Sequence, residues 1–261
     1  MSDESAFEPG GNLATTPGDV VFENEVMQLL QYRPATAQVH VRPLLIVPPC
    51  INKYYILDLQ PENSFVAYAV AQGYTVFLVS WRNAQAEQSS LSWDDYVEHG
   101  VLEALTLAAE IGRADSVNAL GFCIGGTLLA CALAVAKARG QEPVASVTLL
   151  TTMLDFHNTG ELGLLVDEVS VRSREATIGH RGLLQGRELA QVFSALRAND
   201  LIWPYVINGY LKGQAPPAFD LLYWNSDTTN PLADGLLVSA QCLFGESFAD
   251  TRWHGPVRSA C

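Results

Sequence analysis

The chain has 261 residues, of which 49% are hydrophobic and 16% are charged. This composition is that of a globular protein with one sizeable core, and it excludes a disordered chain. The formal net charge of −13 argues against a surface that as a whole binds nucleic acid or an anionic membrane.

The sequence contains no signal for export and no candidate membrane span. Its first residues, MSDESAFEPGGN, are acidic and lack an apolar stretch. The longest apolar run, residues 128–136, is far shorter than the roughly 20 residues that cross a membrane. The five cysteines form no CxxC pair and no metal-site spacing. We therefore predict a cytoplasmic protein without a metal, in which any special cysteine is special for its reactivity.

The first part of the chain leads from an irregular segment into a sheet. Residues 1–40 are mixed in character and are predicted to be irregular, within an N-terminal segment, 1–42. The apolar run 43–47 ends in two prolines, which is typical of a buried strand followed by a loop. Residues 75–80 (TVFLVS) are β-branched and apolar, and they predict a second buried strand.

Helices and strands then alternate. Residues 93–111 predict a helix with acids in its first turn, and residues 117–120 predict a strand. A second helix is predicted from Gly125 to Arg139, ending at a glycine, and a further strand over 145–150. Such alternation favours right-handed crossovers and a parallel sheet, so we predict an α/β core over residues 43–152.

The alternation stops after residue 152. Residues 153–230 are rich in aromatics and indicate helices and loops that form a cap over a site. Residues 231–261 lack periodicity, and we interpret them as an atypical tail.

The segment Gly121-Phe122-Cys123-Ile124-Gly125-Gly126 carries the chemistry. It fits the G-x-C-x-G form of a nucleophile elbow, a strained strand-to-helix turn whose flanking glycines avoid clashes. A strand is predicted before it and an apolar helix after it. We expect Cys123 to be the nucleophile, with its thiol pKa lowered by the helix N-terminus. A cysteine at this position favours thioester chemistry, because thiolate attack on an acyl thioester yields a reactive acyl-enzyme.

An elbow requires an oxyanion hole. One donor is the backbone N–H that follows the nucleophile, here Ile124. The other comes from the loop after the third strand of such folds, where the sequence places Ile51 and Asn52. For Asn52, loop capping is an equally weighted alternative.

Other reactive side chains have simpler interpretations. Cys50 and Cys131 are interpreted as packing residues. Asp155 and the histidines are interpreted as structural or surface residues, and nothing in the sequence places a histidine beside the elbow as a base. The aromatic residues of the cap either line an acyl channel or pack against the core. These histidines and aromatics are His99, His157, His180, His254, Trp203, Tyr205, Tyr210, Tyr223 and Trp224.

Several long blocks resemble class I polyhydroxyalkanoate synthases. They are PLLIVPPCINKYYILDLQPENS (43–64), VFLVSWRN (76–83), LGFCIGG (120–126), SVTLLTTMLDF (146–156), ANDLIWPYVINGYLKG (198–213) and FDLLYWN (219–225). The resemblance extends over roughly residues 5–230. It implies an α/β-hydrolase-type fold with a cap, and it carries the family nucleophile onto Cys123.

The resemblance also implies a reaction, its cofactor requirement and its partners. Such enzymes polymerise (R)-3-hydroxyacyl-CoA, here 3-hydroxybutyryl-CoA, through a cysteine acyl-enzyme and release coenzyme A. They need no cofactor beyond this thioester substrate. The implied partners are the growing polyester chain, the surface of a cytoplasmic granule and a second copy in a homodimer.

The chain departs from the family pattern in ways that matter for activity. It looks incomplete at both ends, and it has Pro204 where the family has Asn. The later blocks that hold the family's catalytic Asp and His are not found in this chain. After Asn230 the resemblance is lost, and we hypothesise that residues 231–261 are read out of frame and pack poorly. We expect the chain as written to accept at most one acyl group and to make no polymer.

Two further functions remain open. One is a thioesterase or esterase on the same fold, which would release free hydroxy acid. The other is an inactive synthase remnant that keeps only an interaction surface.

Overall fold

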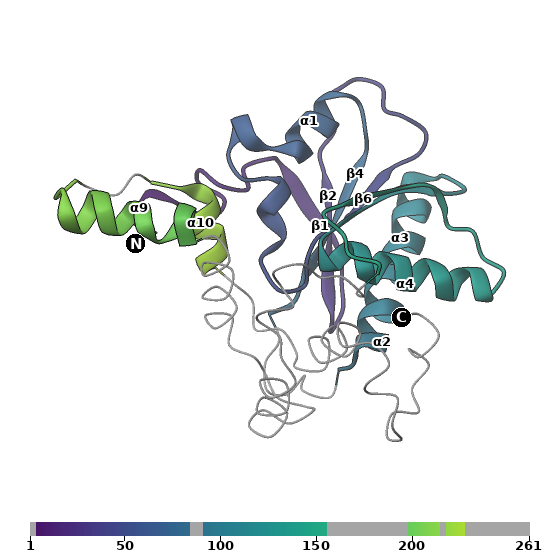
Figure 1. The fold of residues 1–261 in the computed structure, drawn as a ribbon. Helices are drawn as coiled ribbons and strands as arrows, with labels where there is room; N and C mark the ends of the chain where they lie inside the picture. Colours follow the sequence, from purple (N-terminus) through teal and green to yellow (C-terminus); the bar gives the residue numbers. More distant parts are fainter. Residues whose placement is uncertain (1–3, 84–90, 156–197, 215–217, 228–261) are drawn as a thin grey trace, which may run out of the picture.

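The computed structural model describes residues 4–83, 91–155, 198–214 and 218–227 (Figure 1). A six-stranded sheet forms its centre, in the order β1-β2-β4-β3-β5-β6. The strands are β1 (Gly18–Glu23), β2 (Met27–Tyr32), β3 (Leu44–Val47), β4 (Val76–Trp81), β5 (Val117–Phe122) and β6 (Val144–Leu150).

The sheet is mixed in direction. Strands β4, β3, β5 and β6 run parallel, and each corresponds to a strand predicted from sequence. Strands β1 and β2 form an antiparallel hairpin on β4, so the prediction of an irregular segment over residues 1–40 was wrong. Strand β1 is an exposed edge, and β2 carries two glutamines. Neither strand shows the apolar run of a buried strand. Pairing with β4 holds them in the sheet, and that pairing leaves no local pattern in the sequence.

The helices on the sheet are short except for α4. They are α1 (Phe65–Ala71), α2 (Trp93–Asp95), the π-helix η5 (Tyr96–Leu102), α3 (Glu103–Gly112) and α4 (Ile124–Ala138). Short 3₁₀ turns in the described part of the amino-terminal half are η1 (Glu4–Ala6), η2 (Tyr54–Leu57) and η3 (Pro61–Asn63). The helix predicted over 93–111 is thus one continuous run of α2, η5 and α3.

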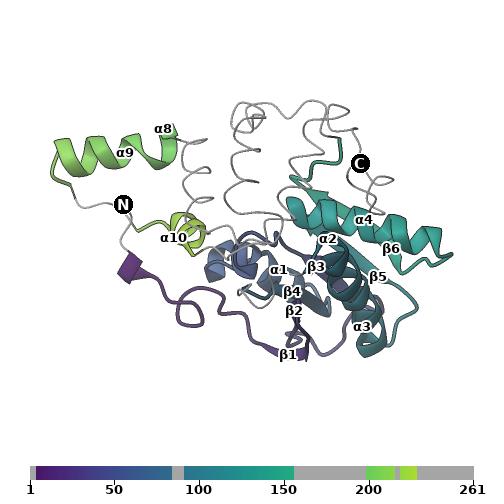
Figure 2. The ribbon, with the colours of Figure 1, turned by 90° about the horizontal axis from the view of Figure 1, so that it is seen from below.

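The core lies on both faces of the sheet. Alternate residues of β4 point to opposite faces: Phe77 and Val79 join one buried cluster, and Val76 and Leu78 join the other. The first cluster is covered by η5, α3 and α4, and the second by α1 (Figures 1 and 2). This three-layer arrangement is that of an α/β fold.

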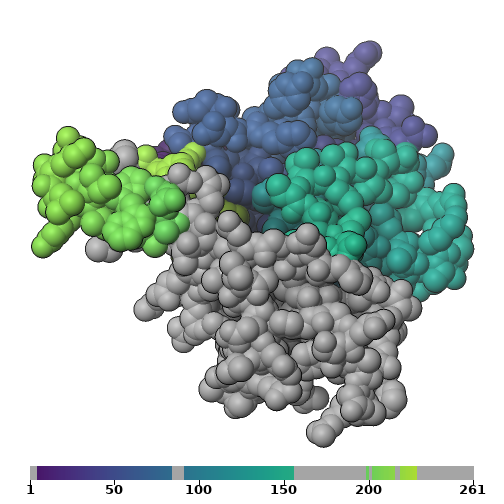
Figure 3. All heavy atoms as spheres, in the orientation of Figure 1, coloured from purple at the N-terminus to yellow at the C-terminus, as the bar shows by residue number. Residues whose placement is uncertain are grey.

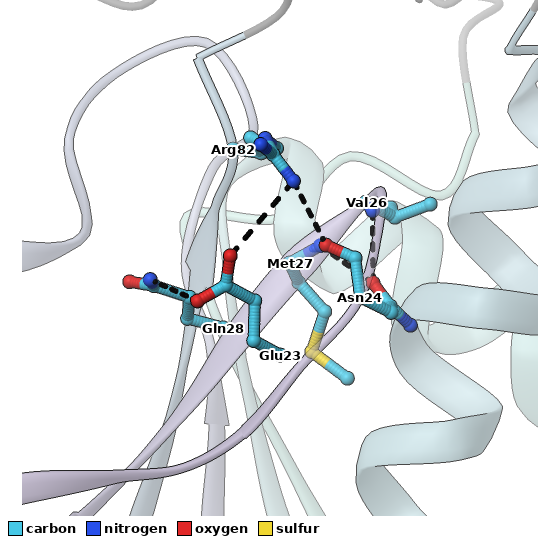
Figure 4. Close-up of polar contacts among 6 residues, drawn as sticks. All are labelled: Glu23, Asn24, Val26, Met27, Gln28 and Arg82. Atoms are coloured by element: carbon cyan, nitrogen blue, oxygen red, sulfur yellow. Dashed lines mark hydrogen bonds and ion pairs between the residues drawn. The ribbon is translucent and has the colours of Figure 1, made fainter.

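Asn24 lies in the turn between β1 and β2, where Figure 4 shows it with Val26, Met27 and Arg82. The Asn24 side-chain oxygen accepts hydrogen bonds from the backbone N–H of Val26 and of Met27. Its amide nitrogen donates to the His99 carbonyl oxygen and to a Glu103 carboxylate oxygen, each at 2.8 Å. Arg82, directly after β4, lies 3.9 Å from the Glu23 carboxylate. The hairpin is therefore held against η5 and α3 as well as against β4.

The described part of the predicted cap is helical. It comprises α8 (Ala198–Leu201), α9 (Trp203–Tyr205), η6 (Val206–Leu211) and α10 (Asp220–Ser226). Helix α10 packs on the main body, where the Trp224 indole donates to the Lys53 carbonyl oxygen and the Tyr55 hydroxyl donates to Asp227. Residues 156–197, 215–217 and 228–261, which include the whole tail, lie outside the described residues, so the packing predicted for the tail stays a prediction.

Residues 198–214 form an arm that stands out from the body (Figures 1 and 3). Large apolar side chains are exposed along it. They are Ile202, Trp203, Val206, Ile207, Tyr210 and Leu211, with Tyr210 86% exposed. The arm thus presents far more apolar surface than an ordinary solvent-facing helix needs.

Candidate active site

Cys123 occupies the turn between β5 and α4, as predicted. Its backbone has φ 54° and ψ −128°, a conformation that L-residues rarely adopt. The strain is held from both sides, because the Cys123 N–H donates to the Leu150 carbonyl oxygen of β6 at 2.9 Å and the Cys123 carbonyl oxygen accepts from the Gly126 N–H at 2.9 Å. A strained residue between a strand and a helix is the geometry of a nucleophile elbow.

The glycines around Cys123 are required by close packing. A Cβ on Gly125 would overlap the carbonyl oxygens of Val47 and Pro48, which belong to β3 and the loop after it. A Cβ on Gly126 would overlap the side chain of Thr152. The first turn of α4 therefore sits directly on the neighbouring loops, and no side chain can be fitted between them.

The thiol of Cys123 is half-buried, and this burial dominates its acidity. Loss of solvation raises the pKa of Cys123 above that of an ordinary thiol, while a hydrogen bond from the Ile124 backbone N–H acts in the opposite direction. The expectation of a lowered pKa was wrong, because the helix N-terminus offers one close amide and burial penalises the thiolate more. Cys123 is therefore mostly a neutral thiol at pH 7.

This acidity makes the pH dependence of alkylation a test of the site. Only the thiolate reacts with iodoacetamide, so a raised pKa means that the rate at Cys123 keeps rising above pH about 8.5, the ordinary thiol pKa. Alkylation of Cys123 is measured by peptide mapping across this range, with N-acetylcysteine as the reference thiol. If the alkylation rate at Cys123 levels off at a lower pH than that of the reference thiol, the pKa of Cys123 is not raised by burial.

The loop after β3 lies beside the elbow. Ile51 and Asn52, the candidate second oxyanion donors, are buried, with Asn52 3% exposed. Within the described residues the side-chain nitrogen of Asn52 has no hydrogen-bond partner. Burial raises the pKa of Cys50 to about 12. The structure thus brings Cys50, Ile51 and Asn52 to the same end of the sheet as Cys123 and Ile124.

The other candidates lie away from this geometry or outside the described residues. Cys131 packs against the core from α4, and burial raises the pKa of its thiol. His99 and Asp155 are exposed. Tyr223 and Trp224 pack beside buried Leu13 and Tyr55, whereas Trp203 and Tyr210 are exposed on the arm and Tyr205 is half-buried there. His157, His180 and His254 lie outside the described residues.

Two residues that support the site were missed by sequence reasoning. The Thr152 hydroxyl donates to the Leu150 carbonyl oxygen at 3.1 Å, and its side chain faces Gly126. Trp81 donates its indole N–H to the Pro48 carbonyl oxygen at 2.8 Å. Both residues lie in blocks that resemble the synthase family, but neither was given a role, because each acts through a neighbour that is distant in sequence.

No group of three or more His, Cys, Asp and Glu side chains is placed to hold a metal ion in the part of the chain that the structure describes. In the same part, no helix has the length and apolar character needed to span a membrane.

Comparison with known proteins agrees with this geometry. Residues 43–241 match the family described as the alpha/beta hydrolase fold. A solved structure described as a lipase from Sulfolobus solfataricus superposes with a TM-score of 0.51 at 13% identity, covering 83% of this chain and 73% of that one. The chain therefore belongs to the α/β-hydrolase family, with a cysteine in its elbow.

Within that family the similarity is to polyester polymerases. Residues 1–69 match the family described as the N-terminus of poly-beta-hydroxybutyrate polymerase (PhaC). The chain is 60% identical over 235 residues to the poly(3-hydroxyalkanoate) polymerase subunit PhaC of Cupriavidus necator, and 49% identical over 243 residues to that of Rhizobium meliloti. These alignments cover 88% and 93% of this chain and 40% of each relative. The chain is thus a relative of PhaC polymerases that spans about two fifths of their length.

Proposed function

We propose that this chain carries the nucleophilic part of a polyhydroxyalkanoate synthase, which polymerises (R)-3-hydroxyacyl-CoA through an acyl group held on Cys123. The observation that carries the proposal is a thiol on a strained elbow beside the Ile124 N–H. The 60% identity with a named polymerase supports the choice of substrate class. In this proposal the coenzyme A thioester is the substrate, and no separate cofactor takes part.

The proposed acyl transfer follows from the placement of the thiol. The sulfur of Cys123, after loss of its proton, attacks the carbonyl carbon of the thioester and forms a new carbon–sulfur bond. The negative charge that develops on the carbonyl oxygen is stabilised by the Ile124 N–H and by a second donor from Ile51 or Asn52. The bond to coenzyme A then breaks, and coenzyme A leaves as a thiol with the proton that Cys123 gave up.

Chain growth requires a second step, in which the hydroxyl of a hydroxyacyl group loses a proton and attacks the thioester. The two described histidines lie in other contacts: His40 packs against Tyr74, and His99 is exposed on η5. We propose that acylation of Cys123 is the step that this chain supports by itself.

The fate of the acyl group tests the proposal against a hydrolase. The chain is incubated with (R)-3-hydroxybutyryl-CoA, and free coenzyme A, protein-bound acyl group and free hydroxy acid are all quantified. We expect coenzyme A to be released once per chain, with the acyl group retained on the protein. Continuous release of free 3-hydroxybutyrate would identify a thioesterase, and release of neither product would identify an inactive remnant.

We propose further that the complete protein works as a homodimer at the surface of a polyester granule in the cytoplasm. Its support in this chain is the exposed apolar surface of the arm, where Tyr210 and Leu211 are 86% and 68% exposed. Light scattering on the complete protein tests the dimer, and co-sedimentation with polyester particles tests the surface.

A further inference from the structure

The loop after β3 is anchored in an unusual way. Pro48 and Pro49 have no backbone N–H, so the start of the loop cannot donate a hydrogen bond to its neighbours. The Pro48 carbonyl oxygen instead accepts a hydrogen bond from the Trp81 indole N–H at 2.8 Å. Trp81 ends β4 and is 6% exposed, so this hydrogen bond is shielded from water and is correspondingly strong.

The Trp81 ring is itself held tightly. Its centroid lies 5.3 Å from that of the Tyr96 ring. A Cβ on Gly100 would lie 2.7 Å from the ring atom Cζ3, so the indole packs directly against the backbone of Gly100. Tyr96 and Gly100 both belong to the π-helix η5, a form that recurs at functional sites. The ring therefore has one position, with its N–H directed at the loop.

The same carbonyl group touches the elbow. The space that a Cβ of Gly125 would need is taken by the carbonyl oxygens of Val47 and Pro48. Gly125 is two residues after Cys123, and Val47 pairs with Gly121 across β3 and β5. A shift of Pro48 would thus be transmitted to the first turn of α4 on one side and to Ile51 and Asn52 on the other.

We propose that Trp81 is a positioning residue for acyl transfer: its indole N–H fixes the loop 48–52 against the elbow and so keeps the two halves of the oxyanion hole in register. The inference rests on the proposed function. Trp81 acts through Pro48 and does not touch the reacting atoms. Its effect falls on the step that creates an oxyanion, because donors placed in advance stabilise the transition state and not the ground state.

Two reactions of the same thiol isolate this effect. Acylation by (R)-3-hydroxybutyryl-CoA passes through an oxyanion, whereas alkylation by iodoacetamide does not. In Trp81→Phe, which keeps a ring and removes the N–H, we expect acylation of Cys123 to slow by about tenfold or more. Alkylation should stay within about twofold, because it needs only an accessible thiolate.

Trp93→Phe is the matched control. Trp93 is 4% exposed and lies in the same core cluster, at the start of α2 and near Cys131, whereas the Pro48 carbonyl oxygen of the loop is bonded by Trp81. The ratio of acylation to alkylation should be unchanged in this variant. If Trp81→Phe does not fold, Gly100→Ala, which displaces the Trp81 ring, should lower the same ratio.

Equal acylation rates in wild type and Trp81→Phe would overturn the inference, and so would an equal fall in both reactions, which would indicate a general structural role. A wild-type chain that is alkylated at Cys123 but never acylated would refute the proposed function, and the inference with it.

Discussion

Replacement of Cys123 by alanine is expected to abolish the release of coenzyme A from (R)-3-hydroxybutyryl-CoA by this chain. The reason is the position of the thiol: of the three cysteines that the structure describes, Cys123 stands at the strained turn between β5 and α4, with an amide N–H beside it. An alanine side chain adopts the same backbone conformation at a similar cost and cannot form the acyl bond. Released coenzyme A, measured with a thiol reagent, should fall to the level of buffer.

The control is Cys131→Ala. Cys131 is a half-buried thiol on the same helix, it packs against the core, and burial raises its pKa as it does that of Cys123. Its removal should leave coenzyme A release unchanged. Thermal unfolding of both variants shows whether the fold is retained. Two results would show that Cys123 is not the nucleophile. One is loss of coenzyme A release in Cys131→Ala with a retained fold, and the other is continued release in Cys123→Ala.

The second large effect is a loss of stability on replacing the elbow glycines Gly125 and Gly126 by alanine. The added methyl group would overlap backbone atoms at one position and a side chain at the other. At Gly125 the obstacle is backbone, the carbonyl oxygens of Val47 and Pro48, which no side-chain substitution can remove. Gly125→Ala should therefore lower the free energy of unfolding by more than about 3 kcal/mol, or prevent folding. At Gly126 the obstacle is the Thr152 side chain, and the expected loss is about 2–3 kcal/mol.

A double-mutant cycle with Thr152→Gly separates the two obstacles. Thr152→Gly removes the atoms that a Cβ at position 126 would meet, so Gly126→Ala should cost at least about 1 kcal/mol less in that background. Gly125→Ala should cost the same in both backgrounds. Urea unfolding of the six chains measures all terms. An equal cost of Gly126→Ala in both backgrounds would show that the elbow relaxes by another route.

Local pattern was sufficient to predict the parallel part of the sheet. Strands β3 to β6 carry apolar or β-branched runs, β3 is followed by two prolines, and α4 begins at the glycines of the elbow. These features depend on neighbours in sequence, so the sequence alone expresses them. The elbow at Cys123 is the strongest case, because its glycines are demanded by the packing that the structure shows.

What escaped prediction depends on contacts between distant residues. The β1–β2 hairpin is held by β4 and by the Asn24 contacts with η5 and α3, none of which has a local pattern. The apolar pattern over 93–111 fits a helix, and a single π-helical stretch within it is too short to leave a pattern of its own, so η5 was not foreseen. The pKa of Cys123 was predicted in the wrong direction because burial is a property of the assembled fold.

The central claim, that Cys123 accepts an acyl group from a thioester, is tested most directly by locating that group. The chain is exposed briefly to (R)-3-hydroxybutyryl-CoA, quenched in acid and examined by intact mass and peptide mapping. We predict a single hydroxybutyryl group on the peptide that contains Cys123. An acyl group on the peptide of Cys50 or Cys131 instead, or an unmodified chain whose Cys123 still reacts with iodoacetamide, would contradict it.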